Sequence, residues 1–332
     1  MQKRQVGPFS VNPVGLGCMN LSHAYGQPPG AEEGARLLHR ALDLGVDFFD
    51  TAALYGFGAN ETLLGQALKG LRQRFTLASK CGMTGVDGKR VIDGRPATLK
   101  ATCEAALQRL QTEVIDLYYL HRRDFNVPIE DSVGALADLV SAGKIRTIGL
   151  SEVSAATIRQ AHAVHPITAV QSEYSLWSRE AEIGVIDACR EIGAAFVAFS
   201  PLARGFLCGE LTDPASQLTG GDIRLAMPRF APDNYARNLA LLDGYRAMAG
   251  EIGCSPAQLA LAWLLNKQPE MLAIPGTRSP AHLEDNLGAA NVPLSAGQIA
   301  RLDALINEKT VVGPRYNAAT QKEIDTEQFA AG

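Results

Sequence analysis

Eight short apolar segments, which alternate with segments of helical periodicity, constrain the fold of this 332-residue chain more than any other feature. Each apolar segment is long enough for a buried strand and too short for a helix. The expected strands are residues 14–17, 46–49, 75–79, 114–120, 145–150, 168–171, 194–199 and 271–274. A row of right-handed strand–helix–strand units forms either a doubly wound parallel sheet or an eight-stranded barrel.

The segments between the apolar runs predict the helices and turns. Apolar residues at helical spacing predict helices over 31–44, 98–110, 128–142, 154–162, 179–192, 234–252, 255–267 and 295–306. A further helix is expected after Asn60, which is a typical N-cap residue. The turns Gly7-Pro8 and Asn12-Pro13 predict a hairpin before the first strand, and residues 202–232 are expected to be irregular.

The first strand distinguishes the two architectures. A doubly wound dinucleotide-binding sheet carries GxGxxG after its first strand, with an acidic residue about twenty positions later. This strand reads VGLGCMN and lacks the third glycine. The sequence therefore predicts an α/β fold, the (β/α)8 TIM barrel, as a single domain over residues 1–332. An N-terminal hairpin and extra C-terminal helices are expected to complete it.

Polar residues follow most of the expected strands. These strand-end residues are Asp50, Lys80, His121, Ser151, Glu152, Gln171 and Ser200. In a barrel of parallel strands the carboxyl ends converge on one cleft, which is where barrel enzymes carry their chemistry. A structural role explains each residue alone, for example a helix cap for Asp50 or a core amide for Gln171. It explains less well that all of them occur together.

Three of these polar residues, together with Tyr55, form a set suited to proton transfer. Tyr55 follows Asp50 in the loop DTAALYG. A tyrosine has a pKa near 10, which is high for an acid at neutral pH, and a nearby ammonium such as Lys80 is expected to lower it. Asp50 would hold the ammonium in place, and His121 would orient an oxygen or relay a proton.

Composition excludes several classes of function. The net charge is −4 and no basic block is present, which disfavours nucleic-acid binding. No apolar run reaches about 18 residues, so no membrane span is expected. The N-terminus MQKRQVGPF does not resemble a signal peptide, and the six cysteines lack CxxC spacing. A cytoplasmic protein without disulfides or a metal site is therefore expected; the absence of an HxH motif also disfavours a metal-dependent barrel hydrolase.

With these motifs in order from VGLGCM to IPGTRSPAHLEDN, the chain resembles the aldo-keto reductases, which are NAD(P)H-dependent enzymes on a (β/α)8 barrel. DTAALYG is similar to the family's Asp-plus-Tyr motif, which implies Asp50 and Tyr55 as catalytic residues. The lysine of ASKCG, Lys80, and the histidine of LYYLHR, His121, match the other two catalytic residues. The segments GLSEVS and QSEYS look most like a microbial and plant branch of the family.

The resemblance also implies an NADPH/NADP+ site. Its expected residues are Gly17, Met19, Asp50, Ser151, Glu152, Gln171, Phe199, Ser200, Pro201, Leu202, Gly205, Gly276, Thr277, Arg278, His282, Asp285 and Asn286. Ser151 and Gln171 would hold the carboxamide and Phe199 would stack on the nicotinamide. The loop from Ser200 to Gly205 would bind the pyrophosphate, and residues 277–286 the adenosine end.

Three positions depart from the family pattern. Glu152 replaces a common asparagine, and a carboxylate is unable to donate to an amide oxygen. Gly276 replaces a common lysine, which would leave the 2'-phosphate of NADPH to Arg278. His282 stands where many members have arginine.

The function that the resemblance implies is NADPH-dependent reduction of a small aldehyde or ketone to an alcohol, with Tyr55 as the general acid. A second hypothesis is a cofactor-binding redox sensor of the kind found as potassium-channel auxiliary subunits, because such proteins keep the same residues. Turnover with small aldehydes would distinguish the two. The sequence indicates neither the physiological substrate nor the oligomeric state.

Overall fold

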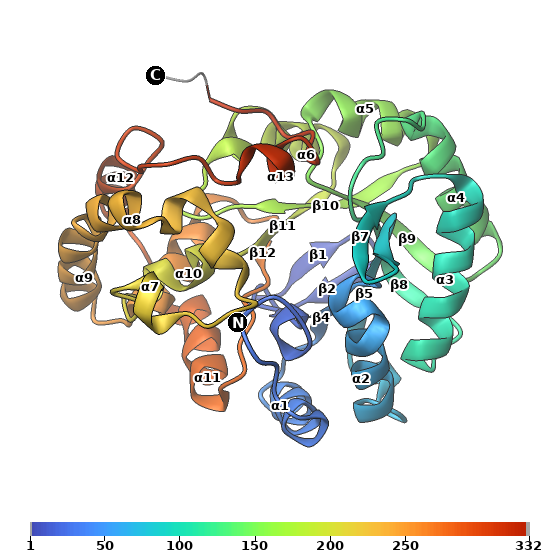
Figure 1. The fold of residues 1–332 in the computed structure, drawn as a ribbon, viewed down its shortest axis with the longest axis horizontal. Coiled ribbons are helices and arrows are strands. Elements are labelled where there is room, and N and C mark those ends of the chain that lie inside the picture. Colours follow the sequence, from blue (N-terminus) through green and yellow to red (C-terminus); the bar gives the residue numbers. More distant parts are fainter. Residues whose placement is uncertain (1, 330–332) are drawn as a thin grey trace.

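An eight-stranded parallel barrel forms the centre of the molecule, for which a computed structural model describes residues 2–329 (Figure 1). The strand order is β12-β11-β10-β9-β8-β5-β4-β3. The strands are β3 (Leu16–Gly17), β4 (Phe48–Asp50), β5 (Thr76–Cys81), β8 (Ile115–Leu120), β9 (Ile145–Ser151), β10 (Ile167–Glu173), β11 (Ala195–Phe199) and β12 (Met271–Ala273). A parallel bridge between Val14 and Ala273 joins the first strand to the last. The predicted (β/α)8 fold is confirmed, and all eight expected strands are present.

Helices surround the barrel on its outside (Figure 1). Those that alternate with the strands are α1 (Ala31–Asp43), α2 (Ala59–Ala67), α3 (Pro96–Leu110), α4 (Ile129–Ser141), α5 (Ala155–Val164), α6 (Val185–Ile192), α10 (Pro256–Lys267) and α11 (Pro280–Gly288). The additional helices are α7 (Pro214–Gln217), α8 (Pro232–Leu239), α9 (Leu241–Ile252), α12 (Ala296–Leu305) and α13 (Ala318–Gln321). The single helix expected over 234–252 is therefore two helices.

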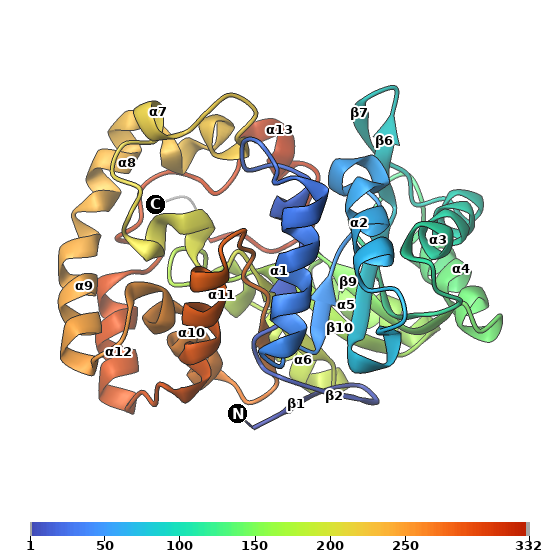
Figure 2. The same cartoon turned by 90° about the horizontal axis from the view of Figure 1, so that it is seen from below.

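Two hairpins lie at opposite ends of the barrel (Figure 2). The predicted N-terminal hairpin, β1 (Arg4–Val6) and β2 (Phe9–Val11), places Val6 and Val11 in one apolar cluster with side chains of the barrel interior. The second hairpin, β6 (Met83–Val86) and β7 (Lys89–Ile92), was not predicted. It follows β5 directly and therefore stands at the carboxyl end, where the strand-end polar residues also lie.

Asn60 does not cap α2, contrary to the sequence-based expectation. The residue before the helix is Gly58, in a left-handed conformation with φ of 95°. Asn60 is fully buried in the first turn, where it pairs with the Thr51 hydroxyl at 2.7 Å and donates to the Cys18 carbonyl at 2.8 Å. It therefore joins the loop after β4 to the loop after β3 and fixes the position of Asp50 between them.

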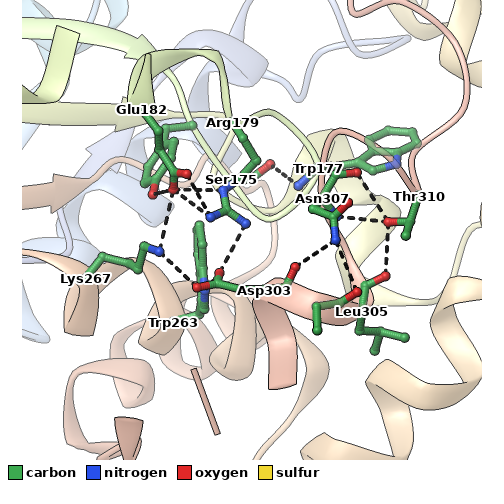
Figure 3. Close-up of polar contacts among 12 residues, drawn as sticks. Ser175, Trp177, Arg179, Glu182, Trp263, Lys267, Asp303, Leu305, Asn307 and Thr310 are labelled. Atoms are coloured by element: carbon green, nitrogen blue, oxygen red, sulfur yellow. Dashed lines mark hydrogen bonds and ion pairs between the residues drawn. The ribbon is translucent and has the colours of Figure 1, made fainter. Parts of the chain in front are cut away.

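A partly buried ion network attaches the C-terminal helices to the barrel (Figure 3). Arg179, in the loop after β10, pairs with Glu182 and also lies 3.1 Å from Asp303 of α12. Asp303 accepts a hydrogen bond from the indole of Trp263 at 2.9 Å and pairs with Lys267 at 3.1 Å, both on α10. The loop after β10, α10 and α12 are thus held in one arrangement behind the cavity wall.

The chain after α12 runs back across the carboxyl end of the barrel as a C-terminal tail, residues 307–329, drawn in red in Figure 1. Arg315 and Tyr316 of this tail are buried. Among the helices of residues 2–329, none combines the length and the apolarity needed to cross a bilayer.

Candidate active site

A cavity of about 1080 Å³ opens at the carboxyl end of the barrel and gathers nearly all of the residues expected from the sequence. Those that line it are Gly17, Met19, Asp50, Tyr55, His121, Ser151, Gln171, Phe199, Ser200, Pro201, Leu202, Gly205, Gly276, Thr277, Arg278, His282, Asp285 and Asn286. Two expected residues are absent from its wall. Lys80 lies directly behind the wall, in contact with it, and Glu152 points elsewhere.

Lys80 is the centre of a buried group at the base of the cavity. Its ammonium donates to the Asp50 carboxylate, to the Thr51 carbonyl at 2.8 Å and to the Tyr55 hydroxyl at 3.2 Å. Gln171 donates to the second oxygen of Asp50 at 2.8 Å. Lys80 lies one residue before the end of β5, Asp50 ends β4 and Gln171 lies on β10, so the barrel brings together residues that are far apart in the chain.

Burial and charge act in opposite directions on this group. Burial lowers the pKa of Lys80, but the charges of Asp50 and Tyr55 and the hydrogen bonds to both together outweigh it, so the net pKa is raised and the ammonium keeps its charge. Burial raises the pKa of Tyr55, and the Lys80 charge offsets only part of that rise. The expected lowering of the tyrosine pKa by Lys80 is present, but burial outweighs it and the net pKa of Tyr55 is raised. The phenol is protonated at neutral pH, with an ammonium beside it to stabilise the phenolate once the proton has left.

His121 stands next to Tyr55, with the two rings edge-to-face and their centroids 5.8 Å apart. Burial, followed by the positive charges of Arg122 and Lys80, brings the pKa of His121 well below its ordinary value. The imidazole is therefore neutral at physiological pH and carries one N–H donor. Within residues 2–329 its Nδ1 has no hydrogen-bond partner. A neutral ring of this kind is suited to donating one hydrogen bond to a substrate oxygen.

The opposite part of the cavity has the features of a dinucleotide site. The loop after β11 carries three consecutive left-handed residues, Ala203, Arg204 and Gly205, and two of them, Arg204 and Gly205, line the cavity. At Gly276 a Cβ atom would lie 2.9 Å from both the Gly17 carbonyl and Oδ1 of Asn20. A lysine therefore does not fit at this position without a shift of the neighbouring chain. Oδ1 of Asn20 is itself buried without a partner in the described chain, as expected of an atom awaiting a ligand donor.

The N-terminus of α11 faces the far end of this cavity. Ser279 caps the helix by accepting from the His282 amide, and Thr277 accepts from the Ser279 amide at 3.0 Å. Arg278 donates to the Gln27 carbonyl at 2.5 Å, and no carboxylate in the described residues pairs with it. The helix dipole and a guanidinium without a carboxylate partner in the described residues together favour a phosphate at this point.

Glu152 does not face the cavity. It is fully buried, pairs with Arg315 of the C-terminal tail and accepts from the Glu173 amide at 2.7 Å. Its own carbonyl accepts from the Asp325 amide at 3.0 Å. The carboxylate of Glu152 therefore anchors the tail. It is not placed to contact the carboxamide of a cofactor, which is the role expected of an asparagine at this position. Sequence reasoning missed Arg315 because a single arginine in a polar tail gives no sign of being buried.

Replacing Glu152 with glutamine should destabilise the protein by about 3–5 kcal/mol, because it leaves Arg315 buried without its counter-charge. Glu191→Gln is the matched control, since Glu191 pairs with Arg159 in an exposed ion pair of the kind that contributes about 0–1 kcal/mol. Urea unfolding of the two variants measures the difference. Equal losses would show that the Glu152–Arg315 pair does not hold the tail.

Other residues of the cavity wall were not assigned individually from the sequence. They come from the loop after β3, the β6–β7 hairpin, the loop after β8 and the tail, and include His23, Arg90, Arg122, Tyr316, Asn317, Thr320 and Glu323. Arg122 directly follows His121, so the strand-end argument would have found it had it been extended by one residue. No local sequence pattern indicates that Arg90 lines the cavity.

Comparison with known proteins identifies relatives of this chain. The sequence profile described as the Aldo/keto reductase family matches residues 13–307. A probable aldo-keto reductase 1 from Glycine max is 42% identical over 311 residues, which cover 93% of this chain and 89% of that protein. Within residues 2–329 no cluster of His, Cys, Asp or Glu side chains is arranged to hold a metal ion.

Two solved structures are similar over nearly their whole length. A glycerol dehydrogenase from Gluconobacter oxydans superimposes with a TM-score of 0.84 at 27% identity, covering 96% of this chain and 99% of that one. An aldo/keto reductase from Klebsiella pneumoniae, described in complex with NADP and acetate, gives a TM-score of 0.72 at 28% identity, with 98% and 99% covered.

Proposed function

The chain belongs to the aldo/keto reductase family, and from that premise we propose that it reduces an aldehyde or ketone to an alcohol with NADPH, using Tyr55 as the proton donor. The observation that carries the proposal is the Tyr55 hydroxyl, which lies 3.2 Å from the buried ammonium of Lys80 at the base of the cavity. A hydroxyl in this position can release a proton to a bound substrate and remain stabilised as a phenolate.

The cofactor assignment rests on the family and on the shape of the cavity. The relative from Klebsiella pneumoniae binds NADP, and the cavity here combines a turn of left-handed residues with a helix N-terminus near Arg278. Ser151 and Gln171 would hold the carboxamide, Phe199 the nicotinamide ring, and residues 277–286 the adenosine end. When bound, NADPH supplies the hydride that the carbonyl carbon receives.

The protein's own residues would then carry the proton and orient the substrate. Tyr55 gives its proton to the carbonyl oxygen as that oxygen gains charge. Lys80, held charged by Asp50, stabilises the phenolate that remains. The neutral imidazole of His121 donates a hydrogen bond to the same oxygen and polarises the carbonyl bond.

A panel of aldehydes, ketones and pyridoxal, assayed by the absorbance of NADPH, tests this function. We expect aldehyde-dependent oxidation of NADPH by the purified protein. Tight NADPH binding without turnover on any member of the panel would favour the redox-sensor alternative.

A preference for NADPH over NADH should depend on Arg278. Arg278→Ala should weaken NADPH binding by roughly ten- to a hundredfold, the range expected when a hydrogen bond to a charged group is lost. NADH lacks the 2'-phosphate, so its affinity should hardly change. Dissociation constants for both cofactors, measured by quenching of intrinsic fluorescence, provide the comparison.

Arg40→Ala is the matched control for Arg278. Arg40 lies on α1 and pairs with Glu284 of α11, the helix that begins just after Arg278. This ion pair is exposed and does not line the cavity. Equal losses for NADPH and NADH in Arg278→Ala would show that the discriminating contact lies elsewhere, with His282 the next residue to test.

A further inference from the structure

Arg122 is a charged residue of the cavity wall to which the proposed mechanism assigns no role. It follows His121 in the loop after β8 and lines the cavity together with His121 and Tyr55. Nη1 of its guanidinium donates to the His121 carbonyl at 2.7 Å and to the Ser151 hydroxyl at 3.3 Å. Both acceptors are uncharged. In the described chain no carboxylate lies within ion-pair distance of Arg122.

The two other guanidinium nitrogens of Arg122, Nε and Nη2, form the edge that is suited to binding a carboxylate. Nε and Nη2 of Arg122 make no hydrogen bond within residues 2–329, and neither is a fully buried unpaired atom. Elsewhere in this protein the same two nitrogens grip carboxylates in pairs. In Arg159 they donate to the two oxygens of Glu191 at 2.8 and 2.9 Å. Nε and Nη2 of Arg122 therefore form a pair of parallel N–H donors that has no acceptor within residues 2–329.

The charges around Tyr55 leave an excess of positive charge at this end of the cavity. Lys80 is matched by Asp50, and Arg90 of the β6–β7 hairpin is matched by Glu323 of the tail. Arg122 has no carboxylate partner within residues 2–329, although the chain as a whole has a net charge of −4. Burial together with Arg122, Lys80 and Arg90 also lowers the pKa of His121, so the imidazole experiences this positive field. An anion placed here gains energy from the same field.

We propose that Arg122 selects carbonyl substrates that also carry a carboxylate, such as aldehyde acids and keto acids, by binding the carboxylate through Nε and Nη2. The proposal rests on the proposed reductase function and names its substrate class. The carbonyl group then lies at Tyr55 and His121 while the carboxylate is held by the neighbouring guanidinium. A purely structural role, in which Arg122 only supports His121 and Ser151, predicts no discrimination between charged and neutral substrates.

The test compares 4-carboxybenzaldehyde with 4-carbamoylbenzaldehyde, which has nearly the same shape and no charge. The quantity measured is the ratio of kcat/KM for the acid to kcat/KM for the amide, with NADPH as the reductant. In the wild-type protein we expect the ratio to favour the acid. In Arg122→Gln the ratio should fall by about ten- to a hundredfold. Arg122→Lys keeps the charge but loses the pair of parallel donors, so it should give an intermediate ratio.

Arg159→Gln is the control, because it removes the same charge from an exposed ion pair outside the cavity. A ratio that is unchanged in Arg122→Gln, or that falls equally in Arg159→Gln, would overturn the assignment. Absence of turnover on both aldehydes by the wild-type protein would instead contradict the proposed function itself.

A second measurement needs no variant. Added salt should raise the KM of the wild-type protein for the acid and leave that for the amide nearly constant, since salt screens an accessible ion pair. An equal response of both substrates would overturn the assignment even if Arg122→Gln failed to fold.

Discussion

Tyr55→Phe should reduce kcat for aldehyde reduction by roughly a hundred- to ten-thousandfold, the usual contribution of a general acid. The Tyr55 hydroxyl lies 3.2 Å from Nζ of Lys80, and phenylalanine keeps the ring but removes the hydroxyl and its proton. NADPH binding should stay within a few-fold of wild type, because the adenosine end of the cavity is untouched. Single-turnover kinetics and a fluorescence titration measure the two quantities separately.

Tyr118→Phe is the matched control for this prediction. Tyr118 lies on β8, is fully buried outside the cavity, and its hydroxyl has no partner within residues 2–329. Removing that hydroxyl should leave turnover near the wild-type value. Retention of more than about a third of wild-type turnover by Tyr55→Phe would exclude Tyr55 as the acid, since no general acid is worth so little.

Lys80→Met should remove most of the activity and also destabilise the fold. The variant loses the charge that offsets part of the burial of Tyr55, so the pKa of the phenol should rise further and proton release should become harder. It also leaves the Asp50 carboxylate buried with only Gln171 as a donor, at a cost of about 3–5 kcal/mol.

Lys100→Met provides the control, since Lys100 pairs with Asp138 in an exposed ion pair at 2.7 Å. Turnover as a function of pH and unfolding in urea are the measurements. A pH profile and a rate equal to those of the wild type would contradict the coupling between Lys80 and Tyr55.

The barrel and its strand ends could be predicted because both depend on local pattern. The limits of an apolar run such as β8 can be read from the sequence. The residue that follows it, His121, then lies at the cavity, because the carboxyl ends of the strands in a barrel converge there. The same reasoning put Asp50 and Gln171 in one cleft although 121 positions separate them.

Features that depend on long-range partners could not be predicted. Glu152 was assigned to the cofactor by its place in a motif, but its partner Arg315 lies 163 positions away in a tail without apolar periodicity. Asn60 has the residue type of a helix cap, and its burial against Cys18 overrides that preference. The effect of Lys80 on the pKa of Tyr55 was predicted, but the larger and opposite effect of burial was not, because the sequence does not show how deeply a side chain is buried.

Transfer of deuterium from NADPH labelled at C4 to the carbonyl carbon of an aldehyde tests the central claim most directly. Mass spectrometry of the alcohol product reports it, with cofactor binding measured on the same sample. We predict a singly deuterated alcohol with the wild-type protein and almost none with Tyr55→Phe, although both bind NADPH. A wild-type protein that binds labelled NADPH and forms no labelled alcohol from any aldehyde of the panel would contradict the account.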